Sequence, residues 1–385
     1  MAMKRINQYH FDSNELIIDW ADGQQSQLAA IWLRDHCQMP DSRDPVSGQR
    51  LVNITDFPLN VTITSVSHID DLLIIDFAPE HRSVLSIDWL IKNCYCINSQ
   101  ADDRSESSKS LWQKSSFEAD IPKHNYPDFC ALPEAKIATL QSVKDYGFAI
   151  LSDVPCEEGE ILNVIAEFGF VRHTNYGPLF EVRTTVNANN LAFTNLGLGC
   201  HLDNPYRDPV PGIQLLHCLQ SSTAGGESIL QDGFMAARLL REENPQHFVT
   251  LSQQWINYRF QDADTDLQAR VPMLEVNDKK EIVKVRYNNR SIATLKLPPS
   301  KVTAFYAAYR HYAEILERKE LQITFKLEPG ELMLFDNTRV MHARTAFSNA
   351  GTRHLQGAYS DLDSLYSTLS VLKSQSSDSD CAKTA

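Results

Sequence analysis

The segment His201-Leu202-Asp203, with His342 and Arg353 far downstream, constrains this chain more than any other feature. Side chains alternate along a strand, so the imidazole and carboxylate of a His-x-Asp pair lie on one side. A distant histidine completes a two-histidine, one-carboxylate set that leaves positions on Fe(II) for a bidentate cosubstrate and O2. The Arg353 guanidinium then suits the far carboxylate of a 2-oxo acid.

The sequence around these residues predicts strands that meet at one site. Residues 332–335 have the pattern of a buried strand, Asp336-Asn337 that of a turn, and 339–342 that of renewed extended structure. Residues 353–359 predict the next strand, with Arg353 and Tyr359 on one face. Neighbouring strands that hold a metal ligand and an anion-binding residue favour a β-helical barrel. A His-x-Asp fragment alone is weak evidence, because a strand-end histidine often only caps its neighbours.

Bulk properties narrow the class of protein. A chain of 385 residues can hold one large domain and a smaller one. Its net charge of -13 argues against a nucleic-acid partner. No apolar run approaches the length of a membrane span or a signal peptide, so we predict a cytoplasmic protein without a membrane partner. Eight irregularly spaced cysteines predict reduced thiols rather than disulfides.

The pattern along the chain predicts four regions. Strand runs predict a small β-rich N-terminal domain over residues 1–97, and a polar stretch with Trp112 as a single aromatic contact predicts a linker over 98–127. The main domain is predicted over 128–372, and a Ser/Asp-rich tail over 373–385 is predicted to be disordered. Helices are expected at residues 132–145, 157–168, 234–243 and 300–317.

Ordered matches along the chain give a resemblance to the γ-butyrobetaine dioxygenase group of the taurine dioxygenase superfamily, from about residue 15 to about residue 372. They include Trp32-Leu33-Arg34-Asp35, Asn175-Tyr176-Gly177, Asn189-Asn190-Leu191-Ala192, Gln214-Leu215-Leu216-His217-Cys218, Asp232-Gly233-Phe234 and Arg353-His354-Leu355-Gln356-Gly357. The resemblance implies a mainly β fold with flanking helices: a double-stranded β-helix (jelly-roll) catalytic domain and a small β-rich accessory domain. It also implies a homodimer that acts on a small molecule.

The resemblance implies Fe(II) as the metal, with 2-oxoglutarate and O2 as cosubstrates. It assigns iron to His201, Asp203 and His342, and the 2-oxoglutarate carboxylate to Arg353. Ser228 is expected to assist Arg353 in binding this carboxylate. The alternative, equally consistent with the sequence, is that its hydroxyl only serves the local turn.

The accessory domain departs from the group. Many members bind structural zinc there through a Cys-x-Cys-x-x-Cys cluster and a histidine. This chain keeps only Cys37 and His81, and two ligands do not close a tetrahedral zinc site. We therefore predict no structural zinc, with a replacement ligand from Cys94 or Cys96 as the alternative.

Four aromatic residues match positions whose rings enclose a trimethylammonium group in the family. Such a cation has no N–H to donate, so ring faces are its natural partners. The residues are Tyr176, Phe180, Phe193 and Tyr359. The simpler alternative is that Phe180 and Phe193 only pack the barrel.

A second set of residues matches the region that contacts the anionic end of the substrate. The set is Asn190, Asn204, Tyr206, Asn288, Asn289 and Arg290. The segment from His201 to Tyr206, together with Asn288-Asn289-Arg290, resembles bacterial dioxygenases that act on 2-(trimethylamino)ethylphosphonate. We therefore predict 1-hydroxylation of that zwitterion. The alternatives are γ-butyrobetaine hydroxylation to carnitine and, for Arg290 itself, a surface salt bridge.

Two other classes of protein are possible from the sequence. One is a betaine-binding barrel without activity, which the complete set of metal residues and Arg353 argues against. The other is a zinc or manganese enzyme that does not use 2-oxoglutarate, and the presence of Arg353 argues against that class.

Overall fold

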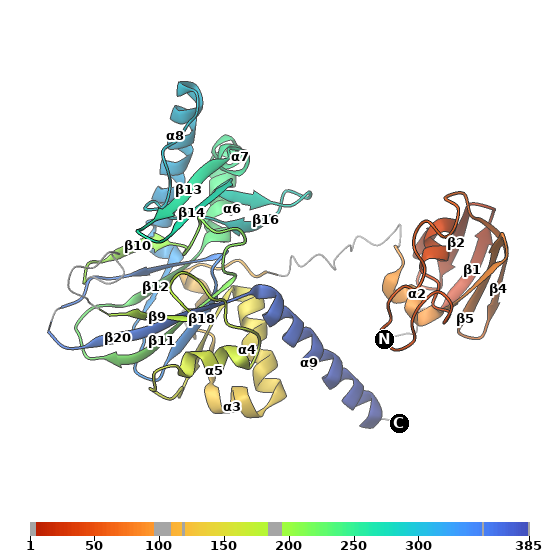
Figure 1. The fold of residues 1–385 in the computed structure, drawn as a ribbon, viewed down its shortest axis with the longest axis horizontal. Coiled ribbons are helices and arrows are strands. Elements are labelled where there is room, and N and C mark those ends of the chain that lie inside the picture. Colours follow the sequence, from red (N-terminus) through yellow and green to blue (C-terminus); the bar gives the residue numbers. More distant parts are fainter. Residues whose placement is uncertain (1–4, 96–108, 118–119, 184–194, 349, 384–385) are drawn as a thin grey trace. The chain divides into compact units, whose positions relative to one another are not determined.

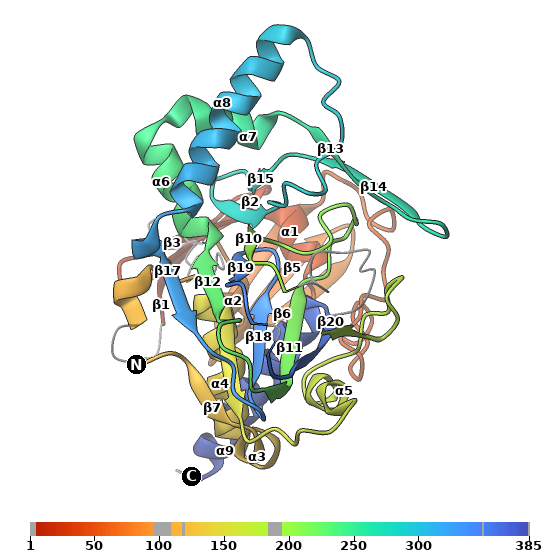
Figure 2. The same cartoon turned by 90° about the vertical axis from the view of Figure 1, so that its left-hand side faces the viewer.

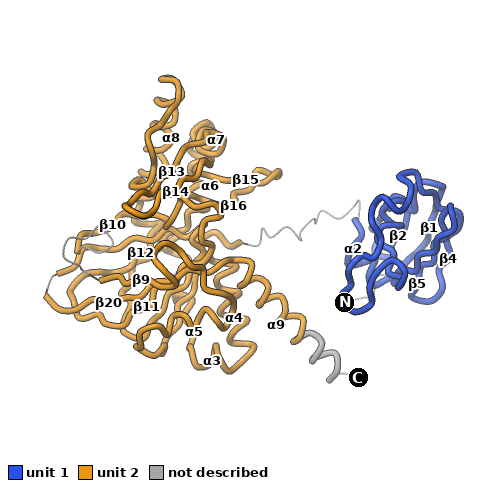
Figure 3. Tube along the Cα trace, viewed as in Figure 1, with its two compact units in different colours: residues 1–107 blue, residues 108–385 orange. Residues whose placement is uncertain are grey.

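The computed structural model describes residues 5–95, 109–117, 120–183, 195–348 and 350–383 (Figure 1). The chain divides into two compact units, Met1–Ser107 and Ser108–Ala385 (Figure 3). None of the described helices has the length and apolar character needed to span a membrane.

The N-terminal unit holds two antiparallel three-stranded sheets. They comprise β1 (Ile6–Phe11), β2 (Glu15–Trp20) and β3 (Gln25–Ala29), then β4 (Thr62–Ile69), β5 (Leu72–Ala78) and β6 (His81–Ser86), with helices α1 (Ala30–Asp35) and α2 (Ile87–Asn93). Alternate residues of β2 are fully buried, as a strand with one face on a core requires. Those residues share one core with side chains of β5, such as Leu73 and Ile75.

No third metal-ligating side chain accompanies Cys37 and His81 among the described residues of this unit. The Cys94 thiol lies 3.2 Å from the Ser26 hydroxyl, and Cys96 falls outside the described residues. The absence of structural zinc stays a prediction.

The larger unit contains two facing sheets. The first has the order β10-β19-β12-β17 and comprises Leu198–His201, Val340–Arg344, Ser228–Asp232 and Gln322–Phe325. The second has the order β7-β8-β18-β11-β20-β9 and comprises Lys123–Asn125, Phe148–Ser152, Leu332–Asp336, Ile213–Ser221, Arg353–Ser360 and Leu179–Val182. Leu230 and Ile323 of the first sheet share a core with Phe335 and Leu355 of the second, so the sheets pack face to face.

Helices cover the outer face of the six-stranded sheet. They are α3 (Tyr126–Ala131), α4 (Pro133–Tyr146), α5 (Glu160–Ala166) and α9 (Leu362–Lys383). Leu334 of β18 packs against this helical layer, whereas its neighbours Met333 and Phe335 face the other sheet. Both faces of β18 are therefore buried, which explains its unbroken apolar sequence.

An insert between β12 and β17 forms the end of the unit opposite α3 (Figures 1 and 2). It comprises α6 (Gly233–Glu243), α7 (Pro245–Gln253), β13 (Ile256–Gln261), β14 (Asp266–Val271), β15 (Leu274–Val276), β16 (Ile282–Val285) and α8 (Pro299–Leu316). Two of these helices, α6 and α8, occur where the sequence predicts them. The core of the insert includes Leu202 and Tyr206, which flank Asp203, so the insert packs directly against the segment that carries this residue.

The linker predicted over residues 98–127 is too long at its C-terminal end. Trp112 is buried, and its indole N–H donates to the carbonyl of Tyr146 at 2.7 Å. Residues 123–125 form β7, which pairs with β8 in parallel. The polar composition of this segment suggested a linker although part of it packs against the larger unit. The larger unit begins at Ser108.

The tail predicted to be disordered from residue 373 is instead the end of α9, which continues to Lys383. The hydroxyls of Ser374 and Ser376 donate to carbonyl groups one turn earlier, at 3.1 and 3.0 Å. Lys373 donates to the side chain of Gln141 on α4. Lys373, Ser374 and Ser376 therefore have hydrogen-bond partners within the helix or on its neighbour α4.

A buried ion pair fixes the start of the larger unit to its sheets. Arg339 and Asp232 are both fully buried, with 2.9 Å between Nη2 and Oδ2. Asp232 also accepts the backbone N–H groups of Trp112 and Phe234, and Arg339 donates to the carbonyl of Ser110. Removal of one partner leaves an uncompensated charge in the core.

We predict that Asp232→Ala lowers the free energy of unfolding by about 3–5 kcal/mol, because Arg339 then stays buried without its carboxylate. Equilibrium urea unfolding of the full chain measures this loss. As a matched control, Glu314→Ala removes the partner of the exposed Arg310 and should leave the unfolding midpoint unchanged. Equal midpoints for Asp232→Ala and the wild type would contradict the prediction.

Candidate active site

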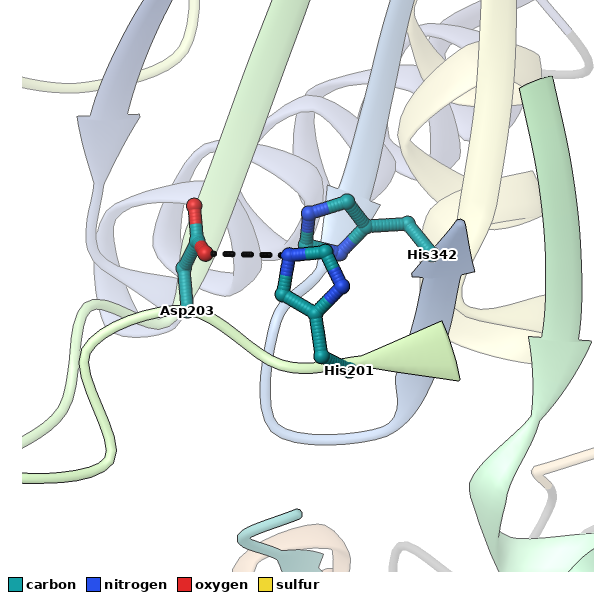
Figure 4. Close-up of side chains that lie close together, drawn as sticks. All are labelled: His201, Asp203 and His342. Carbon is teal, nitrogen blue, oxygen red and sulfur yellow. Dashed lines mark ion pairs between the residues drawn. The ribbon is translucent and has the colours of Figure 1, made fainter. Parts of the chain in front are cut away.

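The antiparallel pairing of β10 with β19 places His201 directly opposite His342. The two imidazole rings lie 4.2 Å apart between centroids. Asp203 follows just after β10, and one ligating atom from each of the three residues lies within 4.8 Å of the others. Figure 4 shows the carboxylate and both rings directed at the same space. The sequence pattern and the fold therefore bring together the same three side chains.

Hydrogen bonds fix the orientation of two members of this set. His201 donates from Nδ1 to the carbonyl of Gly199 at 2.9 Å, which leaves Nε2 for a metal. Asp203 accepts on Oδ2 from Gln214 at 2.8 Å and from the Tyr359 hydroxyl at 2.9 Å. The other oxygen, Oδ1, lies 3.5 Å from His201 Nε2. Partners of this kind orient ligands and tune metal affinity.

Asn337 holds the backbone of Asp203 from the turn between β18 and β19. Its amide donates to the Asp203 carbonyl at 3.0 Å and accepts the Asp203 N–H at 2.9 Å. The position of the carboxylate is therefore set by both sheets.

The protonation states suit a divalent metal. Burial raises the pKa of Asp203, but the polar groups around its carboxylate, His201 first among them, outweigh this effect and hold the pKa well below its usual range. Burial, and next the charge of His201, lower the pKa of His342 to about 3, so its imidazole is neutral at pH 7. Metals bind carboxylates and neutral imidazoles.

The chemistry of the site also fits a bound metal. Two imidazole rings and one carboxylate are directed at the same space, and these are the donors of a two-histidine, one-carboxylate iron site.

One cavity is lined both by the three candidate metal ligands and by two arginines. Its lining includes Phe180, Ser228, Arg344 and Arg353 together with His201, Asp203 and His342. Arg353 and Ser228 are thus where the sequence places them, on the same cavity as the metal residues.

Arg344 was missed by the sequence reasoning. It lies two residues after His342 on β19, so the period of two along a strand would have found it. The guanidinium carbons of Arg344 and Arg353 lie 4.8 and 5.4 Å from the centroid of one ring, Phe347. Burial, and next the charge of Arg353, lower the pKa of Arg344 to about 10, which keeps it protonated. Two neighbouring cations, one buried and one half-buried, favour an anion between them.

Three of the four predicted aromatic residues form a continuous group of rings. Phe180 lies 6.2 Å from Tyr176 and 5.2 Å from Tyr359 between ring centroids. Phe193 and Asn190 fall outside the described residues. Phe260, on strand β13 of the insert, extends the group at 6.1 Å from Tyr176, and no local sequence signal identifies it.

The predicted polar residues lie beside these rings. The Tyr206 hydroxyl donates to the Asn204 side chain at 2.8 Å and lies 3.4 Å from the Tyr176 hydroxyl. Asn288 is buried and donates to the carbonyl of Leu202 at 3.1 Å. The insert and the segment after Asp203 therefore meet at the rings.

Asn289 and Arg290 are exposed residues that line a second cavity of about 650 Å³, with Cys200, Tyr287 and Lys319 among its other lining residues. The charge of Arg290 nevertheless reaches the metal residues, since it lowers the pKa of His342 after burial and His201. Arg290 forms no ion pair with any other described residue, which argues against the surface salt bridge as its role.

Comparison with known proteins gives two family matches. Residues 107–359 match the taurine catabolism dioxygenase TauD, TfdA family, and residues 7–72 match the γ-butyrobetaine hydroxylase-like N-terminal family. The chain is 31% identical to the γ-butyrobetaine dioxygenase of Homo sapiens over 92% of this chain and 93% of that protein. It is also 31% identical, with the same coverage, to the γ-butyrobetaine dioxygenase of Pseudomonas sp. (strain AK-1).

More distant matches include the trimethyllysine dioxygenase of Meyerozyma guilliermondii, at 26% identity over 96% of both chains. Among solved structures, asparagine oxygenase in complex with Fe(II), 2S,3S-3-hydroxyasparagine and succinate matches with a TM-score of 0.47 and 16% identity, over 60% of this chain and 78% of that chain.

We predict that Tyr359→Phe weakens the affinity for a divalent metal by about tenfold or more, because Asp203 Oδ2 loses one of its two donors while the ring stays. Titration with Co(II), followed by its visible absorption, measures the affinity. Tyr306→Phe, at a tyrosine that is 54% exposed on α8, is the matched control. Wild-type affinity in Tyr359→Phe would refute the role given to this hydroxyl.

Proposed function

Because the chain belongs to the taurine catabolism dioxygenase TauD, TfdA family and is an Fe(II)- and 2-oxoglutarate-dependent dioxygenase, we propose that it hydroxylates a small trimethylammonium zwitterion, with γ-butyrobetaine as substrate and carnitine as product. The observation that carries this proposal is the 31% identity to γ-butyrobetaine dioxygenases over nearly the whole chain. The group of rings beside the metal set supports it. We assign the two facing sheets to a double-stranded β-helix.

In this proposal His201, Asp203 and His342 hold Fe(II), and Arg353 holds the far carboxylate of 2-oxoglutarate with Ser228 and Arg344 beside it. When bound, iron and 2-oxoglutarate reduce O2 and supply the oxidant that replaces a C–H hydrogen with a hydroxyl group, with release of succinate and CO2. The protein orients the reactants and excludes water. The guanidinium groups of Arg344 and Arg353 favour a ligand with a carboxylate at its far end over a ligand with a neutral group there.

The rings of Tyr176, Phe180 and Tyr359 receive the trimethylammonium group. A quaternary cation gains from aromatic faces and loses little hydration there. Burial raises the pKa of Tyr359 far above its usual value, so its hydroxyl keeps the proton that it donates to Asp203. One residue thus serves both the cation and the metal ligand, which holds the substrate close to the iron.

The anionic end of the substrate is placed at Asn204, Tyr206 and Asn288, where amide and hydroxyl groups meet. Asn190 and Phe193, outside the described residues, stay in this proposal on the resemblance alone. A homodimer and a cytoplasmic location also stay predictions.

A second candidate substrate is 2-(trimethylamino)ethylphosphonate, which the relatives do not support. One observation favours it: Arg290, whose charge reaches the metal set, forms no ion pair with another described residue. A phosphonate carries more charge and one more oxygen than a carboxylate, so an additional guanidinium would suit it.

We predict that the Fe(II)-loaded protein with 2-oxoglutarate and O2 turns over γ-butyrobetaine with a higher kcat/KM than either 2-(trimethylamino)ethylphosphonate or trimethyllysine. Succinate and the product carrying one added oxygen are measured together. A preference for the phosphonate would instead select the second candidate, and no hydroxylated product with any of the three would overturn the proposed substrate class.

Arg290→Gln distinguishes the two anionic ends in the same assay. If Arg290 serves a phosphonate, this substitution reduces kcat/KM for the phosphonate by a larger factor than for γ-butyrobetaine. Equal factors for both substrates would remove Arg290 from substrate recognition.

A further inference from the structure

The segment 203–211, called the ligand loop here, joins the metal site to the substrate side of the pocket. It begins with Asp203 and continues through Asn204 and Tyr206, which are both buried. Asn204 has a backbone φ of +54°, in the left-handed region that few side chains adopt readily. Asparagine is one of the few non-glycine residues that adopt this conformation readily, so the sequence suits the turn after Asp203.

Arg286 contacts the ligand loop from the insert. It is 2% exposed, and its Nη1 donates to the carbonyls of Arg207 at 2.8 Å and Pro205 at 3.2 Å. Its Nη2 donates to the Asp208 carboxylate at 3.3 Å, and its Nε donates to Glu275 at 3.0 Å. Every guanidinium nitrogen is therefore used, and two of the three hold the ligand loop.

The residues that follow Arg286 extend this junction. The Leu202 N–H donates to the carbonyl of Tyr287 at 2.8 Å, and Asn288 donates to the Leu202 carbonyl at 3.1 Å. Asn288 from the insert is thus bound to the backbone of Leu202, two residues before Asn204.

The far half of the ligand loop has a different support. Arg172 donates to the Pro209 carbonyl at 2.5 Å and forms an ion pair with Asp361 at 2.7 Å. Asp203 itself is held by Asn337 and by its carboxylate donors from β11 and β20, none of which contacts Arg286. Arg286 therefore controls the substrate half of the loop and leaves the metal ligand to other residues.

We infer that Arg286 is a positioning residue for substrate recognition: it holds Asn204 and Tyr206 of the ligand loop against Asn288 of the insert. The inference rests on the proposed function in so far as these three residues contact the substrate. A planar guanidinium reaches two carbonyls and two carboxylates at once, and the single ammonium of lysine does not. The insert thereby contributes to substrate affinity through the ligand loop, whereas the affinities for metal and 2-oxoglutarate depend on residues held by the two sheets.

Arg286→Lys tests this separation of roles, because lysine keeps the positive charge and lacks the planar set of guanidinium donors. We expect KM for the substrate to rise by about tenfold or more. The KM for 2-oxoglutarate and the affinity for Co(II) should stay within about twofold, since the metal and 2-oxoglutarate residues are held by other contacts. Succinate should form in excess of the hydroxylated product, because substrate is held less well while 2-oxoglutarate still reacts.

Arg259→Lys is the matched control. Arg259 belongs to the same insert, and its exposed side chain pairs with Asp266. This control should leave both KM values unchanged.

Hydrogen exchange gives a readout that does not depend on the substrate. Peptides from residues 203–208 should exchange faster in Arg286→Lys than in the wild type, while peptides from β19 exchange at wild-type rates. If Arg286→Lys does not fold, Glu275→Gln removes the carboxylate that orients Nε and should shift substrate KM and exchange in the same direction by smaller factors.

The outcomes separate the two proposals. If the wild type hydroxylates none of the candidates, the proposed function fails, and the exchange rates still test the role of Arg286 in the loop. An unchanged substrate KM, or equal losses for substrate and 2-oxoglutarate with unchanged exchange at residues 203–208, would overturn the inference.

Discussion

The pairing of β10 with β19 is the constraint on which the active site depends, because it sets His201 opposite His342 across two segments that are far apart in the sequence. The third ligand, Asp203, lies beyond the end of β10, where no strand partner holds it. Its position comes from Asn337 on the backbone and from Gln214 and Tyr359 on Oδ2. The metal set is therefore complete only when both sheets are formed.

Charge balance explains why the pocket suits its ligands. Its lining includes the ionised carboxylate of Asp203, the buried guanidinium group of Arg344 and the half-buried one of Arg353. In the proposed complex, a divalent metal compensates the carboxylate, and the distal carboxylate of 2-oxoglutarate compensates the arginines. A trimethylammonium group on the adjacent rings adds a cation on the side of Asp203. The free energy of binding thus includes the neutralisation of charges that folding has already buried.

Much of the site could be predicted from the sequence, because its signals are local or chemically specific. Spacing alone groups His201 with Asp203, and the period of a strand places Arg353 and Tyr359 on one face. The same period would have identified Arg344, two residues after His342. Phe260 and Arg286 could not be found this way.

Their roles depend on how the insert folds back on the ligand loop, which is a tertiary contact. The errors at the linker and the tail have the same cause, since buried Trp112 and the contact of Lys373 with Gln141 outweigh polar composition.

The most direct test of the central claim is an anaerobic titration of the apoprotein with Fe(II) and 2-oxoglutarate, followed by visible absorption. We expect a charge-transfer band that requires both ligands, saturates at one of each per chain, and is abolished by Asp203→Ala. It also predicts that Arg353→Met shifts the band to much higher 2-oxoglutarate concentrations without loss of Fe(II) binding. Tight Fe(II) binding with no band at saturating 2-oxoglutarate, or an unchanged band in Asp203→Ala, would contradict the account.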